Sequence, residues 1–357
     1  MSTLHDTARR ILAHHREAGT PEAEQARAAV AEHLTGLGYQ VSLQRFRFHP
    51  STLLGFPILG AGLGAAALLA LPLVTMPEVP AWGALIVWAV TLLASISLAV
   101  GIAAGWLTLG DAREDANLIA VRSAGPIRRW IVAHLDTKAQ GQSMAGRLVA
   151  VWVLAAAIAA TGALAVARLW GAVPLWLGAS GAGLAVLAGA LAGRGRLQGT
   201  SRGARDNGSG VVAALAFAEV STDDGTGVLI TGGEEFGLVG ARIFARVQNG
   251  LGGTEVINLD TIDDAGDLFV VSHDARGTAA ALTVAASLGG VGLSVRTRRL
   301  PLGILVDSLP LARAGARAVT IGRLTWRTLR IIHTPADVPE SLSLDAAERV
   351  GRAIAVN

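Results

Sequence analysis

Residues 129–136 read Arg-Trp-Ile-Val-Ala-His-Leu-Asp, a short apolar run that ends in an imidazole and a carboxylate. Three further runs end in the same way: Ile-Thr-Gly-Gly-Glu-Glu at 230–235, Val-Ile-Asn-Leu-Asp at 256–260 and Leu-Arg-Ile-Ile-His at 329–333. Short apolar runs that end in polar clusters are typical of buried parallel strands. Ligands of open α/β sheets bind outside the carboxyl ends of the strands. These polar side chains are therefore predicted to converge at one edge of a sheet.

Helices are predicted to alternate with these strands. Apolar patterns of helical period occur at residues 211–220, 278–288 and 344–355, and further strands are expected at 39–48 and 117–122. Strands that alternate with helices indicate an α/β fold, with a mostly parallel central sheet flanked by helices.

The composition indicates a second environment besides water. Of the 357 residues, 52% are hydrophobic and only 16% are charged, whereas soluble proteins carry about 25% charged residues. Four stretches without charge lie at residues 51–77, 79–110, 148–167 and 169–193. Each supplies the ~20 residues that a helix needs to cross a bilayer core of ~30 Å. Buried core helices of a soluble protein are the alternative, but four stretches paired by short turns favour transmembrane helices.

The apolar stretches divide the chain into predicted domains. Residues 51–110 and 148–193 form two transmembrane helix pairs, and residues 1–50, 111–147 and 194–357 form one polar domain. Four spans place all polar parts on one side, where arginines flank the membrane, so the positive-inside rule predicts a cytoplasmic domain. The polar N-terminus does not resemble a signal peptide.

The charge pattern argues against nucleic-acid binding. The net charge is only +3, and the basic residues, 29 of 30 being arginine, are scattered rather than interleaved with aromatic side chains. Cysteine is absent, which excludes disulfides and thiolate metal sites.

Five polar motifs follow one another in a fixed order. They are His-Leu-Asp at 134–136, Asp-Asn-Gly-Ser-Gly at 206–210, Glu-Glu-Phe-Gly at 234–237, Asn-Leu-Asp at 258–260 and His-Thr-Pro-Ala-Asp at 333–337. This order resembles the M28 family of zinc aminopeptidases. The resemblance runs from the N-terminal helices to the C-terminal one and leaves out the apolar stretches. It implies a zinc exopeptidase-like fold.

The resemblance implies a site for two Zn²⁺ ions, although other divalent metals remain possible. Asp206 would bridge both ions. His134 and Asp260 would complete one ion, and Glu235 and His333 would complete the other. Zinc accepts imidazole and carboxylate ligands and keeps a position open for water in catalytic sites.

Catalytic roles are implied for two neighbouring acids. Glu234 would be the general base, and Asp136 would accept the second ring N–H of His134. Asp206 would be followed by a cis peptide bond to Asn207. The Glu234–Glu235 pair could instead be acids at a helix N-terminus, and Asp136 could simply cap a turn.

The function that these features predict is that of a membrane-embedded metallopeptidase, most simply an aminopeptidase. The second apolar pair lies between His134 and Asp206, so the peptide substrate is expected to be hydrophobic or membrane-associated. A carboxypeptidase-type relative would use arginines such as those at 323, 327 and 330, and an inactive scaffold or transporter component is a further alternative. Glutaminyl cyclase relatives use one zinc, and the retention of five ligand positions argues against that activity. The oligomeric state is left open.

Other polar residues receive weaker predictions. Asp263 and Asp264 are expected to be solvated loop acids, and His33 is expected on the surface. His273 is not expected to bind metal. Asp307 is equally compatible with a substrate pocket and with a turn.

Overall fold

The computed structural model describes residues 3–76, 78, 80–194, 197–248, 250–300 and 304–355. The chain divides into two compact units. The sheet unit comprises Met1–Phe48, Ala112–Ala139 and Gly199–Asn357, and the helical unit comprises His49–Asp111 and Gln140–Gln198. The turn expected between the first two apolar helices includes Pro77 and Val79, which lie outside the described residues.

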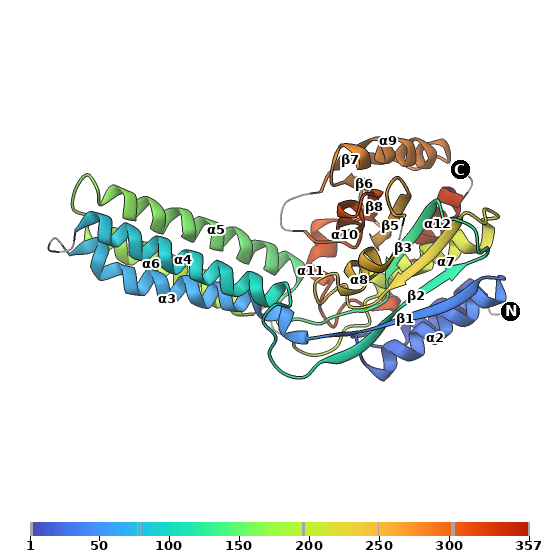
Figure 1. The fold of residues 1–357 in the computed structure, drawn as a ribbon, viewed down its shortest axis with the longest axis horizontal. Helices are drawn as coiled ribbons and strands as arrows, with labels where there is room; N and C mark the ends of the chain where they lie inside the picture. The colour runs from blue at the N-terminus through green and yellow to red at the C-terminus, as the bar shows by residue number, and fades with distance from the viewer. Residues whose placement is uncertain are drawn as a thin grey trace. The chain divides into compact units, whose positions relative to one another are not determined.

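The sheet unit is built on one mixed sheet of eight strands (Figure 1). The strands are β1 (Gln40–Phe48), β2 (Arg113–Val121), β3 (Arg129–His134), β4 (Thr226–Thr231), β5 (Glu255–Ile262), β6 (Leu268–Ser272), β7 (Val295–Arg299) and β8 (Arg317–Arg323). Their order is β1-β2-β4-β3-β5-β8-β6-β7. The central strands β4, β3, β5 and β8 are parallel, whereas β1 with β2, β2 with β4, and β6 with β8 pair antiparallel. The α/β class is confirmed, and antiparallel strands flank the parallel centre.

Helices cover both faces of this sheet. They are α1 (Leu4–Leu12), α2 (Pro21–Gly36), α7 (Ser209–Val220), α8 (Val239–Val247), α9 (Ala275–Gly290), α10 (Ser308–Arg313), α11 (Trp326–Ile331) and α12 (Asp345–Ala355). The larger core joins one face of the sheet to α1, α2, α7, α9 and α12. The smaller core joins the other face to α8 and α10, where Trp130 meets Phe244 edge-on.

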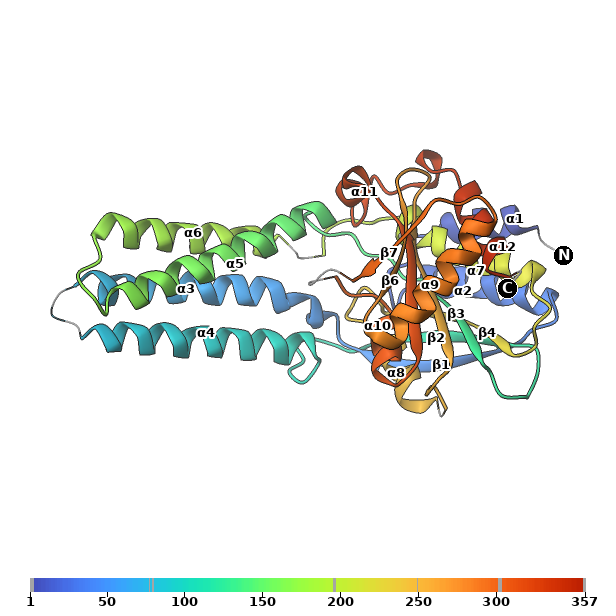
Figure 2. The same ribbon diagram turned by 90° about the horizontal axis from the view of Figure 1, so that it is seen from above.

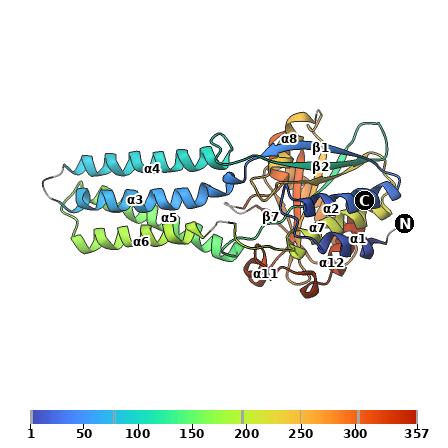
Figure 3. The same cartoon turned by 90° about the horizontal axis from the view of Figure 1, so that it is seen from below.

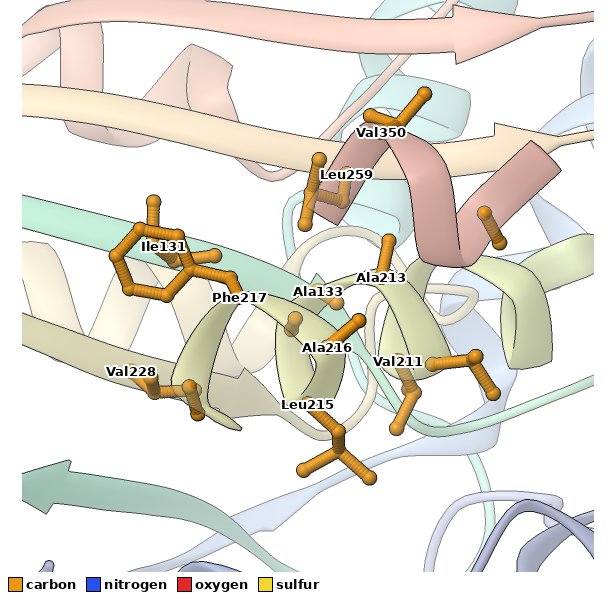
Figure 4. Close-up of a cluster of buried hydrophobic side chains, with 14 of the residues drawn as sticks. Ile131, Ala133, Val211, Ala213, Leu215, Ala216, Phe217, Val228, Leu259 and Val350 are labelled. Carbon is orange, nitrogen blue, oxygen red and sulfur yellow. The ribbon is translucent and has the colours of Figure 1, made fainter. Parts of the chain in front are cut away.

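Helix α7 is buried from Ser209 to Ala218, a stretch without any charged side chain. In Figure 4, Phe217 of α7 lies beside Ile131 of β3, within the larger core that also contains Val350 of α12. The same helix begins at Ser209, within the motif at 206–210. The core therefore holds the start of α7, and with it the motif, against the central strands.

The strand predicted at residues 329–333 is wrong. These residues belong to α11 and the turn after it, and the last strand of the parallel centre is β8. Thr325 caps α11, since its side chain accepts from the Thr328 amide and the Thr328 side chain accepts from the Thr325 amide. This capping box starts a helix where the apolar residues alone suggested a strand. His333 follows with a φ of 65°, a value that few residues other than glycine adopt.

The helical unit contains four long apolar helices, which run side by side in Figures 2 and 3. They are α3 (Gly55–Thr75), α4 (Ala81–Ala103), α5 (Met144–Ala167) and α6 (Leu175–Gly193). Helix α3 packs against α4 and α6, and α5 packs against α6. A Cβ atom at Gly189 would collide with the main chain of Gly60, and one at Gly62 with Ser95. Small residues thus permit close helix contacts, as in membrane bundles.

Within the described residues, two helices are long and apolar enough to cross a membrane, namely α4 and α5. Only 17% and 28% of their most apolar windows are buried, whereas a core helix of a soluble protein would be mostly buried. The described parts of α3 and α6 contain shorter apolar stretches of 10–17 residues. The expected number of spans is therefore supported for two helices of the four.

Candidate metal centre

The structure brings together the five predicted metal ligands and the predicted base Glu234. His134 ends β3, the two adjacent glutamates follow β4, and Asp260 lies near the end of β5. Asp206 lies in the irregular turn Ala204–Gly208 before α7, and His333 follows α11. The six residues (His134, Asp206, Glu234, Glu235, Asp260 and His333) all belong to the sheet unit. They lie at the carboxyl ends of the parallel strands, where α/β sheets bind ligands.

Asp206 occupies the middle of this group. Its Oδ1 lies 3.2 Å from Nε2 of His134, and its Oδ2 lies 3.1 Å from Nε2 of His333. On the first side, His134 Nε2 is also 3.8 Å from Asp260 Oδ1. On the second side, His333 Nε2 is 3.2 Å from Glu235 Oε1. Each oxygen of one carboxylate therefore faces a different set of atoms that could bind a metal.

Two triads could each hold a metal ion. One consists of His134, Glu234 and Asp260, and the other of Asp206, Glu235 and His333, with the ligand atoms of each within 4.8 Å of one another. The first triad places Glu234 among the potential ligands, whereas the sequence predicted it only as a base. Imidazole nitrogens and carboxylate oxygens are donors that zinc accepts.

An unpartnered acceptor also fits a cation. Oε1 of Glu235 is buried and accepts no hydrogen bond from the described part of the chain. Burial would raise the pKa of Glu235, but His333 and Lys138 outweigh it and lower the pKa to about 2. The carboxylate is thus ionised and has an oxygen available for a metal.

Asp136 positions the glutamates rather than the histidine. Its Oδ1 accepts from the Glu234 amide at 3.0 Å and its Oδ2 from the Glu235 amide at 3.1 Å. The ring nitrogen Nδ1 of His134 lies 3.0 Å from the main-chain oxygen of Asp136 and 3.8 Å from its carboxylate. The expected partner of the ring is therefore corrected to the carbonyl, because the two amides after β4 occupy the carboxylate. Burial raises the pKa of Asp136 to about 7, against the effect of His134.

Asp337 forms a second clamp of the same kind, which the sequence did not reveal. Its Oδ1 accepts from the Arg205 amide at 2.9 Å and its Oδ2 from the Asp206 amide at 3.1 Å. Burial raises the pKa of Asp337 to about 6, against the effect of these two hydrogen bonds. Because Asp337 lies four residues after His333, it ties the His333 segment to the Asp206 segment. The only available signal was its place in the motif at 333–337.

The residue after Asp206 anchors the turn to β5. Asn207 Oδ1 accepts from the amides of Gly210 and Thr261, and its Nδ2 donates to the Leu259 carbonyl at 2.8 Å. The Asp206–Asn207 peptide bond is cis, as the family resemblance implied. A Cβ atom at Gly210 would collide with both the Asn207 side chain and the Leu259 carbonyl. Glycine is required there by this close approach.

The only lysine of the chain lies beside the second triad. Lys138 is buried and donates through Nζ to Oε2 of Glu235. The sequence prediction missed this residue, although a single lysine among 30 basic residues, four positions after His134, was a visible signal. Lys138 leaves only Oε1 of Glu235 to face His333.

The first triad is rich in acids. Burial raises the pKa of Glu234 well above its usual range, and the carboxylates of Glu235, Asp307 and Asp260 raise it further, against His134. Asp307 is fully buried in the turn before α10 and accepts from the Thr231 hydroxyl, so the turn is confirmed and the pocket role stays a prediction. Burial raises its pKa to about 6.

Two of the weaker predictions are wrong. Asp263 is buried, since Arg205 Nε and the Thr328 hydroxyl donate to it at 3.1 and 2.5 Å. His33 is buried too, with Nδ1 3.0 Å from the Thr7 hydroxyl. The partners of Asp263 and of His33 are distant in sequence, so the polarity of the neighbouring residues does not indicate that these side chains are buried. His273 contacts Ser308 and belongs to neither triad.

Comparisons with known proteins show what part of the sequence and the fold are similar to. Residues 189–357 match the sequence model for Peptidase family M28. An aminopeptidase from Aneurinibacillus sp. strain AM-1 is 15% identical and aligns over 98% of this chain and 92% of its own, with a TM-score of 0.57. A zinc aminopeptidase from Bacillus subtilis is 15% identical over 99% and 94%, also with a TM-score of 0.57.

Glutaminyl cyclases share the fold as well. The enzyme from Fimbriiglobus ruber is 15% identical and aligns over 99% of this chain and 93% of its own, with a TM-score of 0.55. No curated protein sequence matches. Residues 189–357 are thus similar to Peptidase family M28, and the chain shares its fold with zinc aminopeptidases and glutaminyl cyclases.

Proposed function

We propose that this protein is a membrane-embedded metallopeptidase, an aminopeptidase that acts through two zinc ions. The observation that carries the proposal is the Asp206 carboxylate, whose two oxygens each face a different histidine at 3.1–3.2 Å. Asp206 with His134 and Asp260 would hold one ion. Asp206 with Glu235 and His333 would hold the other.

When bound, two zinc ions lower the pKa of a water molecule and stabilise the tetrahedral oxyanion of peptide hydrolysis. Glu234 takes the proton from the attacking water as its oxygen bonds to the peptide carbonyl carbon. Glu234 then gives that proton to the nitrogen of the leaving amine as the C–N bond breaks. Burial raises the pKa of Glu234, and a higher pKa makes a carboxylate a stronger base.

The carboxylate of Asp136 fixes the main chain at Glu234. The amides of Glu234 and Glu235 are fixed by the two oxygens of Asp136. With both amides fixed, the Glu235 carboxylate would bind the metal, and the adjacent Glu234 carboxylate would face the substrate.

The proposal includes all four apolar helices as membrane spans, with the sheet unit in the cytoplasm. The helical unit interrupts the chain between His134 and Asp206, so we expect a hydrophobic or membrane-associated peptide as substrate. Purified protein should cleave membrane-anchored peptides faster than soluble dipeptides. A clear preference for soluble dipeptides would contradict this part of the proposal.

The catalytic proposal is tested by hydrolysis of peptides with a free or an acetylated N-terminus. Metal-stripped protein should be inactive, zinc should restore activity, and only free N-termini should be cleaved. The variant Glu234→Gln should keep its zinc and lose activity. Release of the C-terminal residue instead would indicate a carboxypeptidase, and a zinc-loaded protein that hydrolyses none of the peptides would indicate an inactive scaffold.

Glutaminyl cyclase activity is a second candidate, which the structural likeness to two enzymes of that name favours. It predicts that peptides with N-terminal glutamine release ammonia and become resistant to acetylation. The same assay mixture distinguishes the two activities, because an aminopeptidase releases free glutamine instead.

A further inference from the structure

A buried arginine outside the region of the family match is hydrogen-bonded to the segments that carry His134 and Asp206. Arg16 lies in the loop between α1 and α2, and its side chain is buried. Neither the sequence motifs nor the mechanism assigns it a role. Its contacts nevertheless lead to both halves of the candidate site.

The guanidinium group binds three main-chain carbonyls. Nε donates to Leu135 at 2.8 Å, Nη1 to Arg202 at 2.6 Å and Nη2 to Gly203 at 2.9 Å. In addition, the Arg16 carbonyl accepts from the Thr137 amide at 3.0 Å. Leu135 lies between His134 and Asp136, and Gly203 lies three residues before Asp206. One side chain thus joins the segment that carries the first histidine to the segment that carries the bridging aspartate.

The charge of Arg16 also faces the site. Within the described residues, no carboxylate lies within ion-pair distance of its guanidinium, and its hydrogen bonds go to neutral carbonyls. The carboxylates that act on it are those of Asp337, Asp136 and Asp206. A buried charge is costly unless it is compensated, so this arginine and the surrounding acids stabilise one another.

We infer that Arg16 is a positioning residue, which holds the His134 segment and the Asp206 segment at the separation that a metal ion between them requires. The inference rests on the proposed metal function. A rigid fork of five N–H donors suits the task, because it can reach several carbonyls at once. Lysine carries the same charge on a single ammonium group and cannot reproduce three divergent bonds.

The test is a titration of metal-free full-length protein with Co²⁺, followed by calorimetry and by visible absorption. Arg16→Met and Arg16→Lys should bind Co²⁺ about 10-fold more weakly, at the low end of the range for losing a direct partner of a metal ligand, because Arg16 holds the two segments and not the ligand side chains. Both should give an altered cobalt spectrum. Thermal unfolding of the metal-free proteins identifies the temperature range in which each variant is folded.

Arg122→Met is the matched control. Arg122 also donates to main-chain carbonyls, those of Ala218 and Ser221, but at the far end of α7. That helix has 12 residues, which at 1.5 Å per residue is about 18 Å. This control should lose stability but keep the wild-type cobalt affinity and spectrum.

The outcomes separate the two proposals. If the wild type binds Co²⁺ tightly and both folded Arg16 variants match its affinity and spectrum, the inference is overturned and the metal centre stands. If Arg122→Met weakens Co²⁺ binding as much as Arg16→Met does, the effect is general destabilisation and the inference is again overturned. If the wild type binds no Co²⁺, the proposed function itself fails.

Discussion

Removal of the only lysine tests whether the buried Lys138–Glu235 ion pair and a bound zinc ion both stabilise the same carboxylate. Lys138 and Glu235 each expose only 3% of their side chains, so solvent screens their ion pair little. Removing one partner of a buried pair costs about 3–5 kcal/mol. For a unit of about 150–250 residues, each kcal/mol shifts Tm by roughly 2–4 °C. Lys138→Met should therefore lower the Tm of the metal-free sheet unit by about 6–20 °C.

Zinc should reverse most of this loss. A cation at Glu235 replaces the positive charge that the substitution removes, so the variant should gain more stability from zinc than the wild type gains. Scanning calorimetry in detergent, with chelator and then with excess zinc, measures both values.

Arg129→Met is the control for this experiment. Arg129 pairs with Glu255 at the other end of β3, where the side chains expose 24% and 14%. Arg129→Met should lower the Tm by less than Lys138→Met does. The decrease should be the same with zinc as without it. Equal losses for Lys138→Met under both conditions, or no loss in the metal-free protein, would refute the account of this ion pair.

Further predictions concern the site and the core. Glu234→Gln should lower kcat about 10²–10⁴-fold, the range for a general base, while zinc content measured by mass spectrometry stays unchanged. Asp206→Asn should lower zinc content at both positions, because one carboxylate serves both. Gly210→Ala should lower the free energy of unfolding by about 1–3 kcal/mol through overpacking, measured by urea titration. Burial lowers the pKa of His33 below its ordinary 6.5, so the unfolded chain binds a proton at His33 more tightly than the folded chain does. The free energy of unfolding should therefore fall as the pH drops below 6.5. The fall should be smaller in His33→Gln, which has no imidazole to protonate.

The central strands and their polar ends could be predicted from the sequence. The strand β3 ends at His134, as the apolar run before that histidine predicted, because apolar runs bounded by polar residues leave little choice of register. The predicted side chains at 134, 234, 235 and 260 also meet, since strand ends in a parallel sheet lie at one edge. Asp206 and His333 join them from a turn and from the end of a helix. Residues 329–333 were mistaken for a strand because the Thr325 capping box was not recognised.

The contacts that hold the site in place could not be predicted in this way. Arg16 binds main-chain carbonyls. Every residue has such a carbonyl, so the residue type at a position does not show which carbonyl is bound. Asp337 and Asp136 bind amides for which the same is true. Asp263 is an acid in an acidic loop, and only the fold brings Arg205 to it. Residues that support the site through such contacts can be identified only from the three-dimensional structure.

Anomalous diffraction from zinc-soaked crystals of the full chain tests the central claim most directly. The account predicts two zinc peaks about 3.5–4 Å apart, with one oxygen of Asp206 on each, His134 beside the first and His333 beside the second. A single peak, or zinc bound away from Asp206, would contradict the two-metal centre.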